Sequence, residues 1–199
     1  MEKTLLELKC KNCMLELDAH NNSKVFFCRN CNLAYNLTQK KELKEFKIIY
    51  AKQLKQMDTK SIYFPFWEIE TEYDIFIEEG MSKENKKLNN TILVPSFFIK
   101  NINYFGDIGY YYFQKEVKIQ GDNKRDFTIF PADRNLNESV KYPELYILKH
   151  YSSKPTVKNF KLNSINYLKA NLILIPFYFE NNYYFDSQIL WKYPSGALI

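Results

Sequence analysis

Histidine and glycine are scarce in this chain, and cysteine occurs only in two pairs. The 199 residues include two histidines, five glycines and four cysteines. The chain has no GxSxG motif, no glycine-rich phosphate loop and no HExxH motif, which mark serine hydrolases, nucleotide sites and zinc proteases. A histidine-based acid–base pair would need His20 or His150. His150 stands beside Tyr151 and is expected to pack rather than to react, so the sequence predicts a protein that is not an enzyme.

Long apolar runs are also missing. No stretch of about 18 apolar residues occurs, so the sequence predicts no membrane span. Residues 1–20 have no apolar core of the signal-peptide type. We therefore expect a soluble cytoplasmic protein, with no small-molecule substrate evident.

The four cysteines form two CxxC pairs, Cys10 with Cys13 and Cys28 with Cys31, separated by fourteen residues. Each pair places two thiolates on one tight turn, and two such turns on a hairpin provide four sulfurs at tetrahedral corners. This spacing predicts a Zn²⁺ site, and because the protein fills all four positions, the ion would be structural. Two disulfides, a redox pair and an iron–sulfur cluster are the alternatives. His20 lies in the intervening turn and is expected to be solvated.

These residues resemble the zinc-ribbon superfamily over about residues 5 to 38, with Leu33 and Tyr35 continuing a strand after the second pair. Ribbons of that superfamily often have glycine after the second cysteine of each pair, where this chain has Met14 and Asn32. A looser resemblance, to uncharacterised bacterial zinc-ribbon proteins with a Pro-Phe-Trp β domain, implies no established activity.

The net charge of +5 arises before residue 61, because the remaining segment has equal numbers of basic and acidic residues. Excess positive charge is typical of proteins that bind an acidic partner, including nucleic acid. A lysine-rich solvated surface explains the same excess. The candidate nucleic-acid contacts are Lys11, Lys24, Arg29, Lys40, Lys44 and Lys47.

Residues 39–57 have an apolar stripe at helical spacing, which predicts an amphipathic connector helix. The stripe comprises Leu43, Phe46, Tyr50, Leu54 and Met57. A strand remains an alternative over 46–50, where Phe46, Ile48 and Tyr50 alternate. The predicted division is a zinc ribbon at 1–38, a basic connector at 39–60 and an aromatic-rich β domain at 61–199.

From residue 61 onward the pattern has a period of two, which favours a mainly β fold with a minor helical part, built as an antiparallel sheet or a partly closed barrel. Three apolar runs contain one proline each, at Pro65, Pro95 and Pro176. Proline belongs at strand edges, starts or bulges. Further strands are predicted at 102–105, 110–119, 127–130 and 183–190, a polar loop at 83–90, an extended loop entering a strand at 154–168, and a short helix at 144–151. The apolar end, 193–199, is expected to dock on its own fold rather than on a partner.

One predicted strand after Pro65 has two contrasting faces. Its apolar face consists of Trp67, Ile69, Thr71, Tyr73, Ile75 and Ile77. Its acidic face consists of Glu68, Glu70, Glu72 and Asp74. We expect the acidic face to be solvated and paired with lysines of a neighbouring strand, with 113–120 as the candidate partner; a hard cation or a basic partner is the alternative.

The function that these features favour is a non-enzymatic adaptor or subunit that mediates protein–protein interaction in a larger assembly. Aromatic side chains suit such an interface. The alternative is a nucleic-acid-binding protein that uses the basic ribbon and connector.

Overall fold

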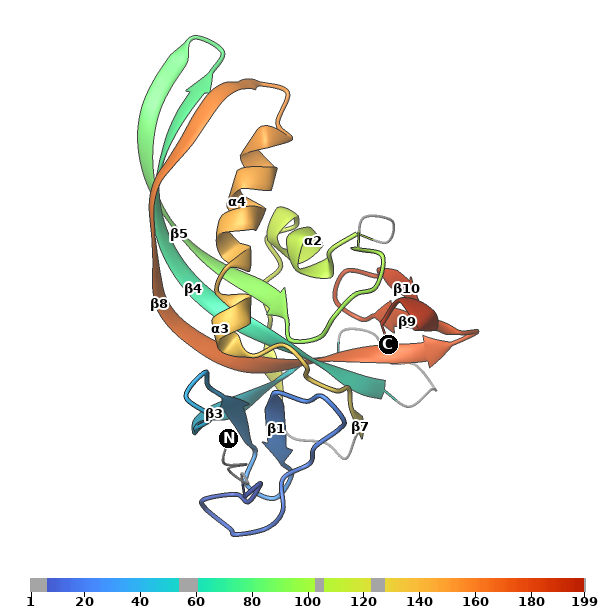
Figure 1. The fold of residues 1–199 in the computed structure, drawn as a ribbon. Helices are drawn as coiled ribbons and strands as arrows, with labels where there is room; N and C mark the ends of the chain where they lie inside the picture. Colours follow the sequence, from blue (N-terminus) through green and yellow to red (C-terminus); the bar gives the residue numbers. More distant parts are fainter. Residues whose placement is uncertain (1–6, 54–60, 103–105, 123–127, 199) are drawn as a thin grey trace.

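The computed structural model describes residues 7–53, 61–102, 106–122 and 128–198, and it shows a mainly β protein (Figure 1). Within these ranges, ten strands form one open sheet whose main path is β1-β2-β3-β8-β4-β5. The strands on this path are β1 (Val25–Cys28), β2 (Leu33–Leu37), β3 (Leu43–Ala51), β8 (Val157–Glu180), β4 (Ser61–Glu79) and β5 (Ser82–Pro95). The short strands are β6 (Gly121–Asp122), β7 (Thr128–Ile129), β9 (Tyr183–Asp186) and β10 (Lys192–Pro194). The helical elements are α2 (Ile108–Gln114), α3 (Leu136–Ser139), α4 (Tyr142–Ser152) and η1 (Ser195–Ala197). The predicted β-rich fold is confirmed, and the sheet is open rather than closed.

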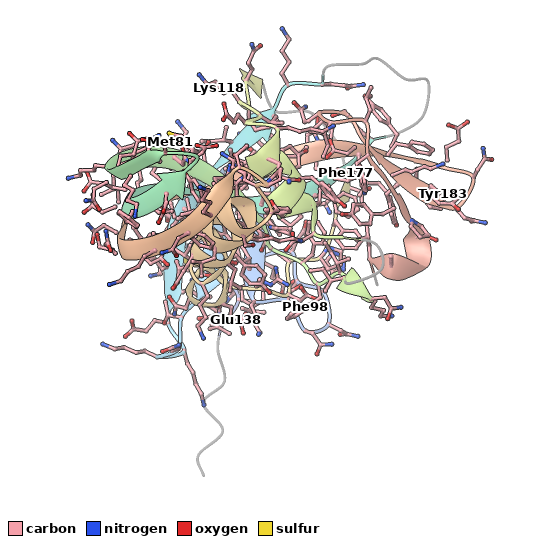
Figure 2. All side chains as sticks on the ribbon, turned by 90° about the horizontal axis from the view of Figure 1, so that it is seen from above. Met81, Phe98, Lys118, Glu138, Phe177 and Tyr183 are labelled. Carbon is pink, nitrogen blue, oxygen red and sulfur yellow. The ribbon has the colours of Figure 1, made fainter. Side chains whose placement is uncertain are left out.

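Strands β4, β5 and β8 extend beyond the rest of the sheet as a curved three-stranded arm, with α4 on its inner side (Figure 1). The arm comprises residues 68–91 of the β4–β5 hairpin and residues 157–170 of β8. Met81 at the hairpin tip is fully exposed, and it lies at the opposite end of the molecule from Tyr183 (Figure 2). Only one face of the arm is therefore covered by the protein's own helices.

The alternation predicted for β4 is confirmed. Its inner face, which carries Trp67, Ile69, Tyr73, Ile75 and Ile77, packs against α4 in one hydrophobic cluster. The outer face of β4 carries the four predicted carboxylates, which are half-buried. Because side chains alternate along a strand, this pattern fixes which face of the sheet meets the helices.

Lysines of a neighbouring strand pair with two outer carboxylates, one of which, Glu72, is among the four predicted. Lys87 lies 3.0 Å from Glu72 and Lys83 lies 3.3 Å from Glu78. Both lysines belong to β5, so the segment proposed as the partner, 113–120, was the wrong one. That segment begins inside α2 instead.

The three prolines lie where no neighbouring strand needs their missing N–H. The carbonyl of Pro65 accepts from the N–H of Ser96, immediately after β5 has ended at Pro95. Pro176 lies in β8 between the residues paired with β3 and those paired with β9. Each proline therefore sits in or beside a strand without breaking a ladder.

The connector was wrongly predicted as a helix. Its described part forms strand β3, which pairs antiparallel with β2 and parallel with β8. The strand alternative over 46–50 is the correct one. The alternating side chains of Phe46, Ile48 and Tyr50 join the core that contains Trp67. Pairing on both sides overrides the helical spacing of the apolar stripe. The end of the predicted helix, 54–57, lies outside the described residues.

Two other segments differ from prediction. The predicted polar loop at 83–90 is part of β5, an edge strand whose outer face is exposed and whose inner-face residues Lys86, Leu88 and Asn90 are half-buried. The predicted strand at 110–119 begins as helix α2, whose N-cap is Asp107, with its side chain accepting from the N–H of Gly109. The helix at 144–151 is confirmed within α4, and the strand at 183–190 is shorter than predicted. The strand at 102–105 falls mostly on residues that are not described.

Strands β1 and β2, which carry the predicted ribbon, share one core with the long strands β4 and β8. Val25, Phe27 and Ala34 belong to the same buried cluster as Trp67 and Leu172. A second cluster on the other face contains Ala197 and Leu198, so the apolar end docks on its own fold as predicted. The division of the chain at residues 38 and 60 remains a prediction.

Gly109 allows α2 to lie against the end of β5. A Cβ atom at this position would lie 2.6 Å from the backbone oxygen of Leu93 and 2.5 Å from the Tyr146 hydroxyl oxygen. Since the backbone oxygen cannot move freely, we predict that Gly109→Ala lowers the free energy of unfolding by about 1–3 kcal/mol. Urea unfolding followed by circular dichroism measures this change. Gly196→Ala is the matched control, because no atom lies within 4 Å of its Cβ position; equal stabilities of the two variants would contradict the prediction.

Candidate metal centre

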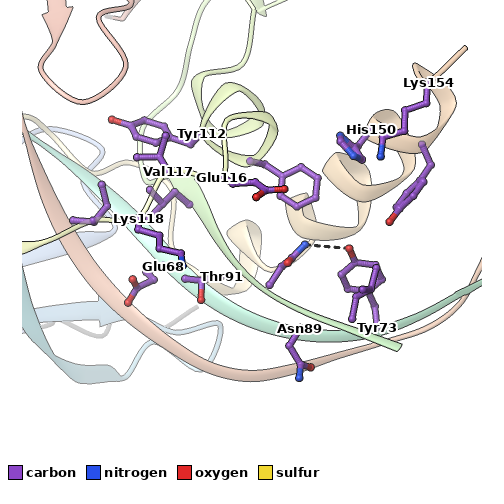
Figure 3. A pocket seen from close by; sticks show the side chains of 16 residues that line it. Glu68, Tyr73, Asn89, Thr91, Tyr112, Glu116, Val117, Lys118, His150 and Lys154 are labelled. Carbon is purple, nitrogen blue, oxygen red and sulfur yellow. Dashed lines mark hydrogen bonds between the residues drawn. The ribbon is translucent and has the colours of Figure 1, made fainter. Parts of the chain in front are cut away.

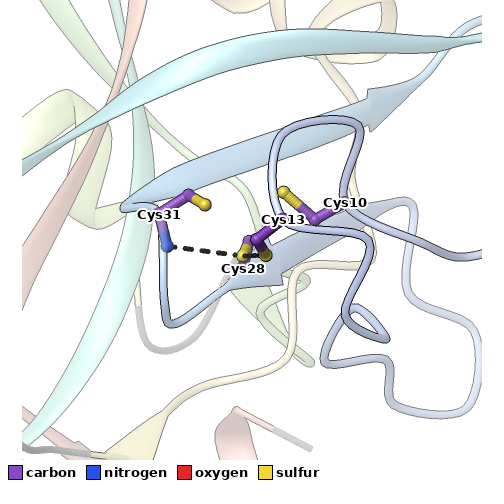
Figure 4. A group of neighbouring side chains, drawn as sticks. All are labelled: Cys10, Cys13, Cys28 and Cys31. Carbon is purple, nitrogen blue, oxygen red and sulfur yellow. Dashed lines mark hydrogen bonds between the residues drawn. The ribbon is translucent and has the colours of Figure 1, made fainter.

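The four cysteines converge on one point between the two knuckles of the ribbon (Figure 4). Their Sγ atoms all lie within 4.8 Å of one another, and those of Cys13 and Cys28 are 3.5 Å apart. Four thiolates about 2.3 Å from a tetrahedral ion would be separated by about 3.8 Å. Cys10 and Cys28 are buried, and Cys13 and Cys31 are partly exposed. The donor set therefore fits one tetrahedral ion.

Both knuckles use a left-handed residue directly after the second cysteine. The backbone φ is 60° at Met14 and 56° at Asn32. Asparagine tolerates this region, but a residue such as methionine adopts it at some cost in conformational energy. At the first knuckle, the N–H of Met14 donates to the carbonyl of Cys10 over 2.9 Å, which closes the turn. The knuckle geometry therefore forms without the glycines that are common in zinc ribbons.

Hydrogen bonds orient the sulfurs. The N–H of Cys31 donates to Sγ of Cys28 over 3.4 Å, and the side-chain amide of Asn12 donates to Sγ of Cys31 over 3.3 Å. The Tyr35 hydroxyl lies 3.3 Å from Sγ of Cys10. Such outer groups tune the affinity of a site for its metal.

Tyr35 is the functional residue that the motif did not reveal. Its side chain is fully buried, and its hydroxyl accepts from the N–H of Lys11 and lies 3.2 Å from a carboxylate oxygen of Glu45. Burial raises the pKa of Tyr35, so the hydroxyl stays protonated and available as a donor. Its place two residues after Leu33 in the predicted strand was visible in the sequence, but its contact with the sulfur was not.

The thiols do not ionise alike. Burial alone would raise the pKa of Cys10, but hydrogen bonds from Tyr35 and from the backbone of Cys13 and Asn12 outweigh it and lower the pKa to about 6. Burial raises the pKa of Cys28 to about 12. Neighbouring thiols cannot all carry charge without a cation among them. A bound metal would hold all four as thiolates and release protons on binding.

Comparison with protein-family models finds no match, and neither curated proteins nor solved structures give a similar chain. The assignment of the site therefore rests on its own geometry. Four cysteines lie close enough together to hold a metal ion, which is consistent with a site of the zinc-ribbon type.

Of the six basic candidates, Lys11 and Arg29 lie within the two CxxC knuckles, and the other four lie outside them. His20 is exposed in the turn before β1. Lys24 pairs with Glu138 and Arg29 pairs with Asp18, so both charges are locally balanced. Lys44 and Lys47 lie on opposite faces of β3, since their positions differ by three, an odd number. The Lys11 ammonium reaches the carbonyl of Leu43, and Lys40 is exposed in the turn after β2.

A cavity of about 560 Å³ lies far from the cysteines, between β5, α2 and α4 (Figure 3). His150 lines it, with its ring edge-on to Phe113 and Tyr151, and burial lowers its pKa. Glu116 and Lys154 line the same cavity. Within the described part of the chain, no hydrogen bond joins the His150 ring to a carboxylate or to a hydroxyl.

Among the described helices, none has the length and apolar character needed to cross a membrane.

We predict that Tyr35→Phe weakens metal binding by about 10-fold or more, because it removes the hydroxyl beside Sγ of Cys10 while keeping the buried ring. Competition with a chelator for the bound metal measures the affinity. Tyr193→Phe removes a buried hydroxyl from the other core cluster and serves as the control. Equal metal affinities of the two variants would argue against a role for Tyr35.

Proposed function

We propose that this protein is a zinc-stabilised, non-enzymatic adaptor or subunit that binds another protein. The observation that carries the proposal is the arm. Strands β4, β5 and β8 run well beyond the core, and along the arm no described strand pairs with the outer edge of β5 or of β8. A rigid, exposed sheet of this kind provides both edges and a face for association.

The metal in this proposal is structural Zn²⁺. The donor set is four thiolates from the protein, which suits zinc and leaves no open position for a substrate. The ion would fix the knuckles, and the second knuckle is tied to the sheet: the carbonyl of Asn32 accepts from the N–H of Ile48 and its side chain accepts from the Tyr50 hydroxyl. The proposed role of zinc is therefore to hold the ribbon on the sheet.

Metal analysis of the purified chain should give one zinc per molecule, and Cys28→Ser should lose it. Because metal binding is coupled to folding of the knuckles, a strong chelator should lower the thermal midpoint of the wild type and leave the already metal-free variant unchanged. Stoichiometric iron in place of zinc, or disulfides in mass spectra of the alkylated protein, would contradict the assignment.

Affinity capture with the tagged full-length chain from extracts of its native host tests the adaptor role. We expect a stoichiometric protein partner that survives nuclease treatment and moderate salt. The alternative, nucleic-acid binding, predicts recovery that is lost after digestion and falls steeply as salt rises. The absence of any stoichiometric protein partner would contradict the proposal.

A further inference from the structure

The outer edge of β5 is open along the arm. Among the described strands, β5 pairs only with β4. Helix α2 closes the end of this edge, where Gly109 lies against the backbone oxygen of Leu93. From Leu93 back toward the hairpin tip, no described element continues the sheet.

The backbone groups of this edge point away from β4 at every second residue. The carbonyl of Leu93 faces α2, whereas the carbonyl of Asn90 accepts from the hydroxyl of Thr71 in β4. Because the direction alternates along a strand, the N–H and C=O groups of Thr91 and Asn89 face outward. No backbone hydrogen bond to these groups is present within the described ranges. They are therefore available to a further strand.

The cavity lies beside this edge rather than above one face. Residues from both faces of β5 line it, including Leu88 from the inner face and Thr91 from the outer face. Residues 116–119 form the facing wall, and His150 and Lys154 stand near one end (Figure 3). The recess beside the edge is lined by Leu88, Tyr73, Phe113 and Tyr151 together with polar and charged residues, and it has room for a side chain of an added strand.

The two free edges of the arm differ. The pairing of β8 with β4 shifts register three times, which leaves Leu168, Asn163 and Lys158 as extra residues along the β8 edge. Bulges of this kind disrupt an edge and discourage pairing. The β5 edge keeps an unbroken register with β4 from Ser82 to Pro95. Only the β5 edge is therefore regular enough to accept a strand.

Charge selects the kind of strand. On the outer face, Lys87 and Lys83 of β5 lie opposite Asp74 and Glu78 of β4. A strand added beyond β5 would lie next to these two lysines, and a carboxylate is favoured opposite a lysine. A second copy of β5, paired antiparallel about Lys87, would place the two Lys87 side chains opposite each other, which is unfavourable.

We propose that the β5 edge from Lys83 to Thr91 binds an extended segment of a partner protein as an added strand. The segment has acidic side chains on the outer face, opposite Lys83 and Lys87, and an apolar or aromatic side chain in the recess beside Leu88. This inference deepens the proposed adaptor function and rests on it.

Selection from a displayed library of random peptides about twelve residues long, on the intact chain, tests the inference. Selected peptides should alternate acidic with apolar residues, and should protect the amides of 85–91 from hydrogen exchange. N-methylation of alternate peptide amides should abolish binding, because it blocks backbone pairing. Peptides without acidic enrichment, protection elsewhere, or failure to select any peptide would overturn the inference.

Lys87→Glu should weaken binding of a selected peptide by about 10-fold or more, since it reverses one of the charges that selects the strand. Lys161→Glu makes the same change at an exposed outer-face position of β8 and should alter the affinity by less than about twofold. Asn89→Pro removes an outward N–H and should abolish binding; circular dichroism verifies that each variant is folded. Equal effects of Lys87→Glu and Lys161→Glu would count against the β5 edge.

Capture from host extract with the same variants separates this inference from the adaptor function. A partner retained equally by wild type and Asn89→Pro would overturn the edge inference while the adaptor function stands. A partner lost with Asn89→Pro and Lys87→Glu would support both. A concentration-dependent dimer of the wild type that Asn89→Pro abolishes would assign the edge to a second copy and overturn the inference.

Discussion

The two-faced pattern along β4 is the constraint on which the rest of the structure depends. Every second side chain from Trp67 to Ile77 is buried beneath α4, and the intervening carboxylates face outward. A register slip of one residue would exchange these faces and bury the charges, so the pairing with β5 and β8 is strongly specified. Once that register is fixed, β8 presents Leu172 to Leu174 to β3, and the ribbon is attached to the sheet.

The sequence predicts best where the chemistry is local. Four thiols at CxxC spacing identify the metal site, and alternation identifies β4, because both signals lie within a few residues. The misassigned segments depend on remote partners. The stripe around Phe46 and Tyr50 fits a helix until β2 and β8 are known to flank it. Similarly, the polar run of β5 becomes a strand only because β4 offers a long ladder, and the contact between Tyr35 and Cys10 requires the folded ribbon.

Asn32 of the second knuckle links the metal centre to strand β3. Asn32 has the left-handed backbone that the knuckle needs, and it also accepts two hydrogen bonds from β3. Ordering of the thiolates would therefore order the strand that pairs with β8. The side chains that β3 buries belong to the same core as Trp67. The metal site and the core therefore meet at strand β3.

An exposed edge strand can pair with other chains and aggregate unless its chemistry limits which strands can pair with it. Along the arm, β8 limits pairing by bulges, whereas β5 relies on lysine. Lys83 and Lys87 disfavour a second identical strand, but they are already held beside Glu78 and Glu72, so their orientation is set before any partner arrives. An acidic segment would meet pre-positioned cations and unpaired backbone groups together. The same residues that oppose self-association therefore provide selectivity for an acidic strand, which a bulged edge could not offer.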